Sequence, residues 1–324
     1  MGERLQQLTD WVRERIGGQT FQMEPASDDA SFRRYFRVTY AGKSIIAMDS
    51  PPDKEKNPEF VHIAGLFHAA GLNVPRIIET DTERGFLLLT DLGQRQYLSE
   101  LNAGTVERLY GDAISALVAF QACIHDADLP GYDETLLLQE MALFSDWYLA
   151  QEKTRQLTDA QQTTLADTYA LLAQSALAQP VVCVHRDYHS RNLMICDDHT
   201  PGILDFQDAV MGPITYDLVS LLKDCYITWP HAQVQDWVKG YQDLLLQSGL
   251  LQVDNLAQFQ QWFDWMGVQR HLKATGIFAR LKHRDGKMGY IKDIPRTMAY
   301  VTDVSQRYPA LQPFYRLLVE LGEA

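Results

Sequence analysis

The chain has 324 residues, 46% of them hydrophobic, and a formal net charge of −13. This length allows one large or two moderate domains, and this composition supplies a real core. The negative charge argues against a nucleic-acid binder, whose affinity rests on neutralising phosphates. The four cysteines lie mostly in apolar stretches, and neither an apolar signal segment nor a membrane-spanning run occurs. We therefore expect reduced thiols, a cytoplasmic location, and no nucleic-acid or membrane partner.

The N-terminal part of the sequence predicts a small sheet with two helices. Apolar residues at helical spacing mark the helices, and short apolar runs bounded by turn residues mark the strands. The predicted elements are a helix over 5–16, a strand ending at Tyr40, a returning strand over 44–48, a helix capped by Asn57 and ended by Gly71, and strands over 74–79 and 85–90. We place a domain boundary after these strands, which gives domains over residues 1–92 and 93–324.

The remainder of the chain is mainly helical by its apolar periodicity. Helical segments are predicted near 105–125, 135–150, 157–177, 214–227, 231–248 and 256–282. Three short apolar runs interrupt them and predict strands over 181–184, 193–196 and 203–204.

Polar residues that suit phosphoryl transfer lie between and after these three strands. Residues 185–192 read His-Arg-Asp-Tyr-His-Ser-Arg-Asn, and Asp205 ends the third strand. Phosphoryl transfer needs positioning and neutralised charge more than covalent chemistry. Asp187 can hold an acceptor hydroxyl, and the oxygens of Asn192 and Asp205 can hold Mg²⁺ on nucleotide phosphates. Protein kinases space their catalytic loop and their metal-binding aspartate in the same way.

Three motifs in order carry a resemblance to a known superfamily: His-x-Asp-x-His-x-x-Asn, Ile-x-Asp-Phe and Gly-Pro-x-x-x-Asp-Leu. They resemble the aminoglycoside phosphotransferase and choline kinase superfamily. Their fuller forms are most similar to the anomeric N-acetylmuramate/N-acetylglucosamine kinases of bacterial cell-wall recycling. The resemblance runs from about Ser31 to about Arg296. It implies a bilobal, protein-kinase-like α+β fold, with an antiparallel N-lobe sheet, a helical C-lobe, and ATP and Mg²⁺ bound between the lobes.

The resemblance also implies roles for the residues of the three motifs. Asp187 would orient the acceptor hydroxyl and take its proton, while Asn192 and Asp205 would hold the metal. His185 would pack beneath the catalytic loop, and Asp217 would anchor that loop by hydrogen bonds.

The nucleotide-binding candidates lie in residues 1–92. Ser31 and the following amides occupy the place of the kinase loop that covers phosphates, and residues 90–92 occupy the place of the hinge. Asp49 falls at or next to the kinase lysine that pairs the phosphates, so we expect another cation there. The candidates by position are Ser31, Arg33, Arg34, Thr90, Asp91 and Leu92. An unrelated surface role is the alternative for the two arginines.

Residues 270–296, the basic segment, hold eight Lys or Arg and two Asp. The segment has a net charge of +6, so the rest of the chain carries −19. Arg270, Lys273 and Arg280 share a helical face by spacing, and we expect them to bind an anionic substrate. Asp224 is a further candidate for substrate binding. The alternative is that the cations pair with acidic neighbours on the surface.

The sequence therefore predicts an ATP-dependent kinase for the anomeric hydroxyl of an amino sugar, N-acetylmuramate or N-acetylglucosamine, in peptidoglycan recycling. An aminoglycoside, choline or other small-alcohol phosphotransferase is the alternative, although the first two substrates are cations. An inactive nucleotide-binding regulator is a further alternative, which the intact Asp187, Asn192 and Asp205 argue against. Only nine residues separate Asp205 from Thr215, which leaves no room for a protein kinase's activation segment.

Overall fold

The computed structural model describes all residues except 1, 28–31, 126–128 and 198–199. The chain forms two compact units: residues 1–100 with 192–207, and residues 101–191 with 208–324. The chain thus leaves the first unit, enters the second, returns for one short segment, and goes back. The division into functional domains after residue 92 stays a prediction. Within the described part of the chain, no helix combines the length and the apolar character needed to cross a bilayer.

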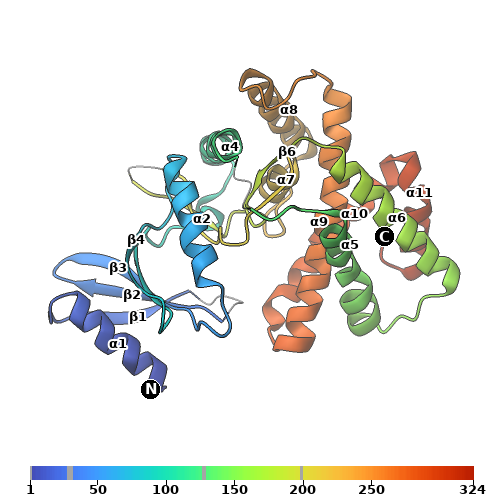
Figure 1. Cartoon of the computed structure of the whole chain (residues 1–324). Coiled ribbons are helices and arrows are strands. Elements are labelled where there is room, and N and C mark those ends of the chain that lie inside the picture. Colours follow the sequence, from blue (N-terminus) through green and yellow to red (C-terminus); the bar gives the residue numbers. More distant parts are fainter. Residues whose placement is uncertain (1, 28–31, 126–128, 198–199) are drawn as a thin grey trace. The chain divides into compact units, whose positions relative to one another are not determined.

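The first unit is built on a five-stranded antiparallel sheet (Figure 1). Its order is β1-β2-β3-β5-β4, with β1 (Gln22–Ser27), β2 (Arg34–Tyr40), β3 (Lys43–Asp49), β4 (Ile77–Asp81) and β5 (Phe86–Thr90). Helix α1 (Glu3–Arg15) packs Leu8, Trp11 and Val12 against one face, in a core shared with Ala47 and Leu88. Because side chains alternate along a strand, Asp49 lies on the same face of β3 as Ala47.

A second helix and a short hairpin complete this unit. Helix α2 (Asn57–Ala69) places Phe60 and Phe67 against Phe206, with ring centroids 5.2 and 5.7 Å apart. Phe206 follows the hairpin of β7 (Leu193–Met194) and β8 (Gly202–Ile203), and α3 (Tyr97–Glu100) precedes the break to the second unit. The returning segment therefore supplies part of the core of the first unit.

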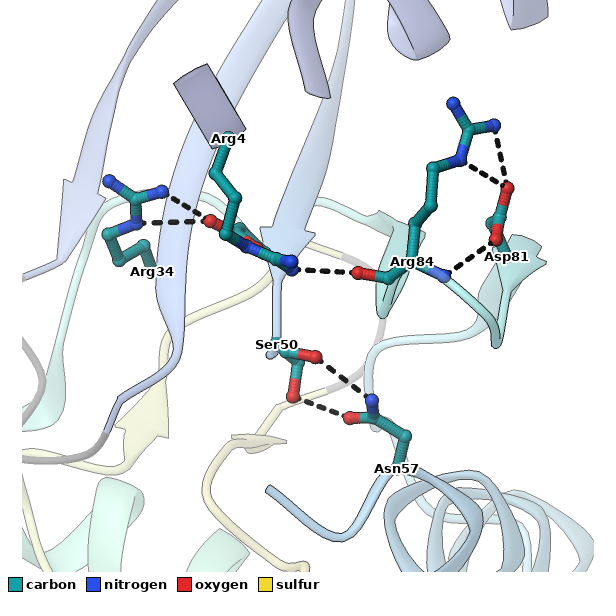
Figure 2. A network of polar contacts seen from close by, with 7 residues as sticks. Arg4, Arg34, Ser50, Asn57, Asp81 and Arg84 are labelled. Carbon is teal, nitrogen blue, oxygen red and sulfur yellow. Dashed lines mark hydrogen bonds and ion pairs between the residues drawn. The ribbon is translucent and has the colours of Figure 1, made fainter. Parts of the chain in front are cut away.

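The predicted role of Asn57 as a helix cap is wrong. Lys56 holds the N-cap position, and Asn57 is buried in the first turn. The Asn57 amide donates to the Ser50 carbonyl at 2.9 Å and accepts from the Ser50 hydroxyl at 2.5 Å (Figure 2). A short polar side chain before a proline is typical of a helix cap. Here the Asn57 side chain forms its hydrogen bonds with the buried Ser50 instead of capping the helix.

The second unit is mainly helical (Figure 1). Its α-helices are α4 (Val106–Cys123), α5 (Glu134–Leu143), α6 (Asp159–Leu177), α7 (Tyr216–Leu222), α8 (His231–Gln247), α9 (Leu256–Asp285), α10 (Ile294–Arg307) and α11 (Gln312–Leu321). Strand β6 (Val181–Val184) pairs antiparallel with β9 (Val210–Pro213). Short helices of other types span η1 (Phe144–Glu152), η2 (Met288–Asp293) and η3 (Pro309–Leu311). The predicted α+β fold is confirmed.

Helix α9 is the element that most others in the second unit contact. A side chain at Gly276 would bring Cβ within 2.3 Å of the Leu143 carbonyl carbon, so only glycine allows this approach. Just there, α5 widens into the π-helical η1, a form that often accompanies functional sites. The close approach brings Glu140 of α5 next to the buried positive charges of α9.

Candidate functional site

The loop of residues 185–190, which the sequence predicts to be the catalytic loop, is held at its start by a buried carboxylate. Asp217, in the first turn of α7, accepts from the backbone N–H of His185 at 2.6 Å and of Arg186 at 3.0 Å. Arg186 has a φ of 75°, which a non-glycine residue keeps only when its surroundings hold it there. These two hydrogen bonds fix the backbone immediately before Asp187.

A second buried carboxylate fastens the end of the same loop. Asp224 accepts from the backbone N–H of Ser190 at 2.9 Å, from its hydroxyl at 2.5 Å, and from the Tyr226 N–H at 2.9 Å. Sequence analysis predicts a substrate contact for Asp224, whereas these contacts are those of a residue that positions the loop. Sequence reasoning assigned the anchoring role to Asp217 and missed the same role for Asp224, two residues beyond the end of α7.

His185 lies beneath the loop and is fully buried. Its Nδ1 accepts from the Asp187 N–H at 3.2 Å, and its ring meets Tyr188 edge-on with centroids 5.7 Å apart. The Tyr188 hydroxyl donates to the Ala113 carbonyl at 2.8 Å. His185 therefore supports the backbone of Asp187 and the packing of the loop.

Asp187 is partly buried and surrounded by positive charge. Burial opposes ionisation, but the charges of Lys273, Arg270 and Arg186 outweigh it and hold the pKa of Asp187 below its usual range. Asp187 is therefore a carboxylate at neutral pH, the form that accepts a hydrogen bond from a hydroxyl group.

Glu140 organises two of these cations. Its carboxylate contacts the Arg186 guanidinium at 2.5 Å and the Lys273 amine at 2.9 Å, and it accepts from the Tyr132 hydroxyl. Lys273 also donates to Tyr216 at 3.0 Å. Burial works against the charge of Glu140, but Lys273 and Arg186 lower its pKa nonetheless. Sequence reasoning missed Glu140 and Arg186, although Arg186 stands inside the quoted motif.

The basic segment does not act as one surface. Lys273 and Arg270 are buried and their charges act on Asp187, whereas the charges that act on Arg280 are those of Arg284 and Asp285. Arg280 is ten residues beyond Arg270 on α9, a rise of about 15 Å along a helix. The three candidates therefore separate into an inner pair and an outer residue.

Asn192 and Asp205 come together in the first unit, on either side of the β7–β8 hairpin. The Asn192 amide donates to Asp205 at 3.2 Å, and Gln207 donates to the other Asp205 oxygen at 2.7 Å. The hydrogen bond from the Leu204 N–H to the Asn192 carbonyl, 2.9 Å, fixes the two strand ends. Asp205 has a φ of 63°, a strained backbone form found at functional sites.

These two side chains fit Mg²⁺, which prefers hard oxygen ligands and keeps several waters. Over the described residues, no three His, Cys, Asp or Glu gather in a way that would hold a metal by themselves. A metal held by Asn192 and Asp205 would therefore complete its coordination with nucleotide phosphates and water.

The predicted hinge residues have structural contacts within the first unit. Asp91 accepts from Arg37 at 2.6 Å, from Ser44 at 2.5 Å and from the Gly93 N–H at 2.9 Å. Burial raises the pKa of Asp91, but the hydrogen bonds from these donors, Arg37 first among them, have the larger effect. The pKa of Asp91 is therefore lowered. The Thr90 hydroxyl accepts from the Arg76 N–H, and the Leu92 carbonyl accepts from the Cys196 thiol at 3.5 Å. Ser31 lies outside the described residues.

The two predicted phosphate-binding arginines already face carboxylates. Arg34 and Arg4 converge on the fully buried Asp49, where Arg4 Nε lies 2.9 Å from the carboxylate (Figure 2). Arg33 pairs with Glu55 at 2.9 Å. Asp49 thus joins α1 to the sheet, and a role for either arginine in binding ATP stays a prediction.

We expect Arg34→Ala to lower the free energy of unfolding by about 1–3 kcal/mol, because the buried Asp49 loses one of its two guanidinium partners. Urea denaturation measures this, with Arg108→Ala, which removes an exposed arginine on α4, as the control. Unchanged stability with a raised KM for ATP would instead assign Arg34 to the nucleotide.

A five-stranded antiparallel sheet followed by a mainly helical unit is the architecture of a protein-kinase-like phosphotransferase. The chain belongs to the phosphotransferase enzyme family typified by aminoglycoside phosphotransferases, whose family model matches residues 22–262.

Relatives in sequence and in structure agree with this family. The chain is 46% identical to the N-acetylmuramate/N-acetylglucosamine kinase of Pseudomonas putida, over 98% of this chain and 96% of that protein. It is 43% identical to the enzyme of the same name in Neisseria meningitidis, over the same shares. Among solved structures it is similar to the ADP-bound aminoglycoside phosphotransferase APH(2'')-Ib, with a TM-score of 0.62, 14% identity, and 92% and 98% coverage of the two chains. A choline kinase of Streptococcus pneumoniae gives a TM-score of 0.60, 11% identity, and 92% and 99% coverage.

Proposed function

We propose that this protein transfers the γ-phosphoryl group of ATP to the anomeric hydroxyl of N-acetylmuramate and N-acetylglucosamine, giving the sugar 1-phosphate and ADP. The observation that carries the proposal is the 43–46% identity to kinases of that name over nearly the whole chain. A place in peptidoglycan recycling, in the cytoplasm, is part of the proposal. The four cysteines, all free thiols, support a reducing compartment.

In the proposed mechanism, Asp187 accepts a hydrogen bond from the anomeric hydroxyl and takes its proton as the new oxygen–phosphorus bond forms. The bond between the γ-phosphorus and the bridging oxygen breaks, and ADP leaves. The low pKa of Asp187 suits a base that takes the proton late, when the oxygen is already bonded to phosphorus. Asp217, Asp224 and His185 keep Asp187 in place.

The nucleotide side of the proposal uses the first unit. Asn192 and Asp205 would hold Mg²⁺, which when bound neutralises negative charge on the phosphates. The backbone of residues 90–92 would bind adenine, and the loop at Ser31 would cover the phosphates. Residues 1–92 would thus bind and cover the nucleotide, and residues 93–324 would supply the two metal ligands, the catalytic loop and the acceptor site.

A substrate panel tests the proposed function. The purified protein is given ATP, Mg²⁺ and either N-acetylglucosamine, N-acetylmuramate, choline or an aminoglycoside, and ADP release is followed. We expect turnover on both amino sugars and an acid-labile anomeric phosphate by phosphorus NMR. N-Acetylglucosaminitol, which lacks the anomeric hydroxyl, is the matched control and should stay unphosphorylated. Turnover on choline or an aminoglycoside alone would contradict the substrate and leave only the family.

We expect Asp205→Ala to weaken Mg²⁺-dependent ATP binding by about 10-fold or more, because one charged oxygen ligand is lost. Calorimetry with Mg²⁺ and with EDTA measures the difference, and sugar binding serves as the internal control. A variant that keeps the full effect of Mg²⁺ on ATP affinity would show that Asp205 does not hold the metal.

A further inference from the structure

Arg270 is a buried cation whose hydrogen-bonding capacity is largely unused. The residue is 5% exposed, and no carboxylate of a described residue lies within 4.0 Å of its guanidinium. Its one hydrogen bond runs from Nη1 to the Cys225 thiol at 3.7 Å, and Nε is buried without a partner. A guanidinium has five donors, and burying them unbonded is costly. Such a group in a native protein calls for a partner.

The other cations near Arg270 each have an oxygen acceptor for their hydrogen bonds. Arg186 and Lys273 both contact Glu140, and Arg296 donates to the Cys225 carbonyl at 2.7 Å. Lys282, further along α9, pairs with Glu152. Pairing with acidic neighbours therefore accounts for much of the basic segment, but it does not account for Arg270.

Arg270 lies beside the residues that anchor the Asp187 loop, because its Nη1 contacts Cys225 and the preceding residue, Asp224, accepts from the Ser190 N–H of that loop. Its charge acts on Asp187, and Asp187 and Asp224 act on it. Burial lowers the pKa of Arg270, but Cys225, Tyr216 and Asp187 outweigh burial and raise it, so the guanidinium is charged. Asp187 and Asp224 balance this charge through space without accepting its hydrogens.

One edge of the Arg270 guanidinium has no hydrogen-bond acceptor among the described residues. Nη1 faces Cys225, so Nε and Nη2 form the edge that no hydrogen bond to a described residue occupies. Two parallel N–H groups on one planar edge match the two oxygens of a carboxylate. An ammonium group has the same charge but lacks this planar fork.

The geometry points to Arg270 as the residue that binds the carboxylate of the acidic acceptor and so sets the preference between the two sugars. This inference rests on the proposed function. N-Acetylmuramate is N-acetylglucosamine with a lactyl ether that ends in a carboxylate, so the two sugars differ in the group that the unbonded Nε–Nη2 edge fits. Arg270 would thus favour the acidic sugar, while Asp187 meets the anomeric hydroxyl that both sugars share.

Arg270→Lys tests the inference sharply, because it keeps a positive charge beside Asp187 and removes the fork. We expect kcat/KM for N-acetylmuramate to fall about 10- to 100-fold, mainly through KM, as for the loss of a charge-assisted bidentate contact. For N-acetylglucosamine we expect kcat/KM to stay within about threefold, a loss far below that of a charged contact. Calorimetry without nucleotide should show the same selective loss of N-acetylmuramate binding.

The control variant is Lys239→Gln, which removes one exposed charge of α8 and should leave the ratio of the two kcat/KM values unchanged. Thermal unfolding shows whether Arg270→Lys is folded. If it is not, the wild-type protein still tests the inference with the methyl ester of N-acetylmuramate, which adds one methyl group to the lactyl side chain and removes its charge. We expect the wild type to prefer the acid over the ester by about 10-fold or more.

Two results would overturn the inference and leave the proposed function standing. Turnover on both sugars with equal losses in Arg270→Lys would mean that Arg270 acts on Asp187 or on the transferred phosphoryl group, an anion common to both reactions. Equal use of acid and ester by the wild type would exclude a carboxylate contact in the same way. A wild type that phosphorylates neither sugar would remove the proposed function, and the inference with it.

Discussion

Asp187→Asn is expected to lower turnover by about 10²–10⁴-fold while ATP binding stays close to that of the wild type. The amide has nearly the same size as the carboxylate, but it cannot take a proton and its NH₂ group repels the hydroxyl hydrogen. The loop should keep its shape, since its anchors are Asp217, Asp224 and His185. Steady-state kinetics with both sugars gives kcat, and calorimetry gives the affinity for ATP.

Asp208→Asn is the matched control for this variant, because it changes an exposed aspartate close in sequence to Asp205, the proposed metal ligand. Near-normal turnover of Asp187→Asn would remove Asp187 from its role as the base. A loss of ATP affinity as large as the loss of kcat would show that the residue serves the nucleotide instead.

Asp217→Asn is expected to lower kcat by about 10- to 100-fold with little change in either KM. The asparagine has one acceptor oxygen for two N–H groups, so His185 or Arg186 would lose a hydrogen bond worth about 1.5–3 kcal/mol. Folding should survive, because burial raises the pKa of Asp217 to about 7 and a neutral side chain is therefore tolerated there. We therefore expect the lost hydrogen bond to misplace Asp187 and so to lower kcat, without unfolding the protein.

Thermal unfolding and the separate values of kcat and KM distinguish this positioning role from a general loss of structure. A folded Asp217→Asn protein with normal kcat would show that the catalytic loop holds its shape without this anchor. Asp243→Asn, on the surface of α8, gives the background effect of removing one negative charge.

The strong local patterns of the sequence predicted their elements well. Strand β6 spans the predicted residues 181–184, and α9 begins at the predicted residue 256. Elements with weak patterns were missed. Strand β1 reads Gln-Met-Glu-Pro-Ala-Ser, where Glu24 and Pro25 hide the alternation that marks a strand. It lies at the edge of the sheet, the place where a sheet tolerates proline.

The candidate site likewise contains residues that the sequence could identify and contacts that it could not. Asp187, Asn192 and Asp205 could be selected because their chemistry and spacing stand within one short stretch. The partners of Asp49, Arg270 and Lys273 could not, because a charge count does not say which cation meets which carboxylate. Arg4 reaches Asp49 across 45 positions, and Lys273 reaches Glu140 on another helix. Only the folded chain separates Arg270 from the cations that are already paired.

The split first unit has a consequence for synthesis on the ribosome. Residues 1–100 emerge first, but Phe60 and Phe67 cannot be covered until Phe206, which is 1% exposed in the finished fold, has been made. At about 5–20 residues per second, that delay is about 5–20 s. Throughout it, helix α2 presents an aromatic surface without its cover. Chaperone binding to stalled nascent chains should therefore persist past residue 100 and end only after residue 207 has left the exit tunnel.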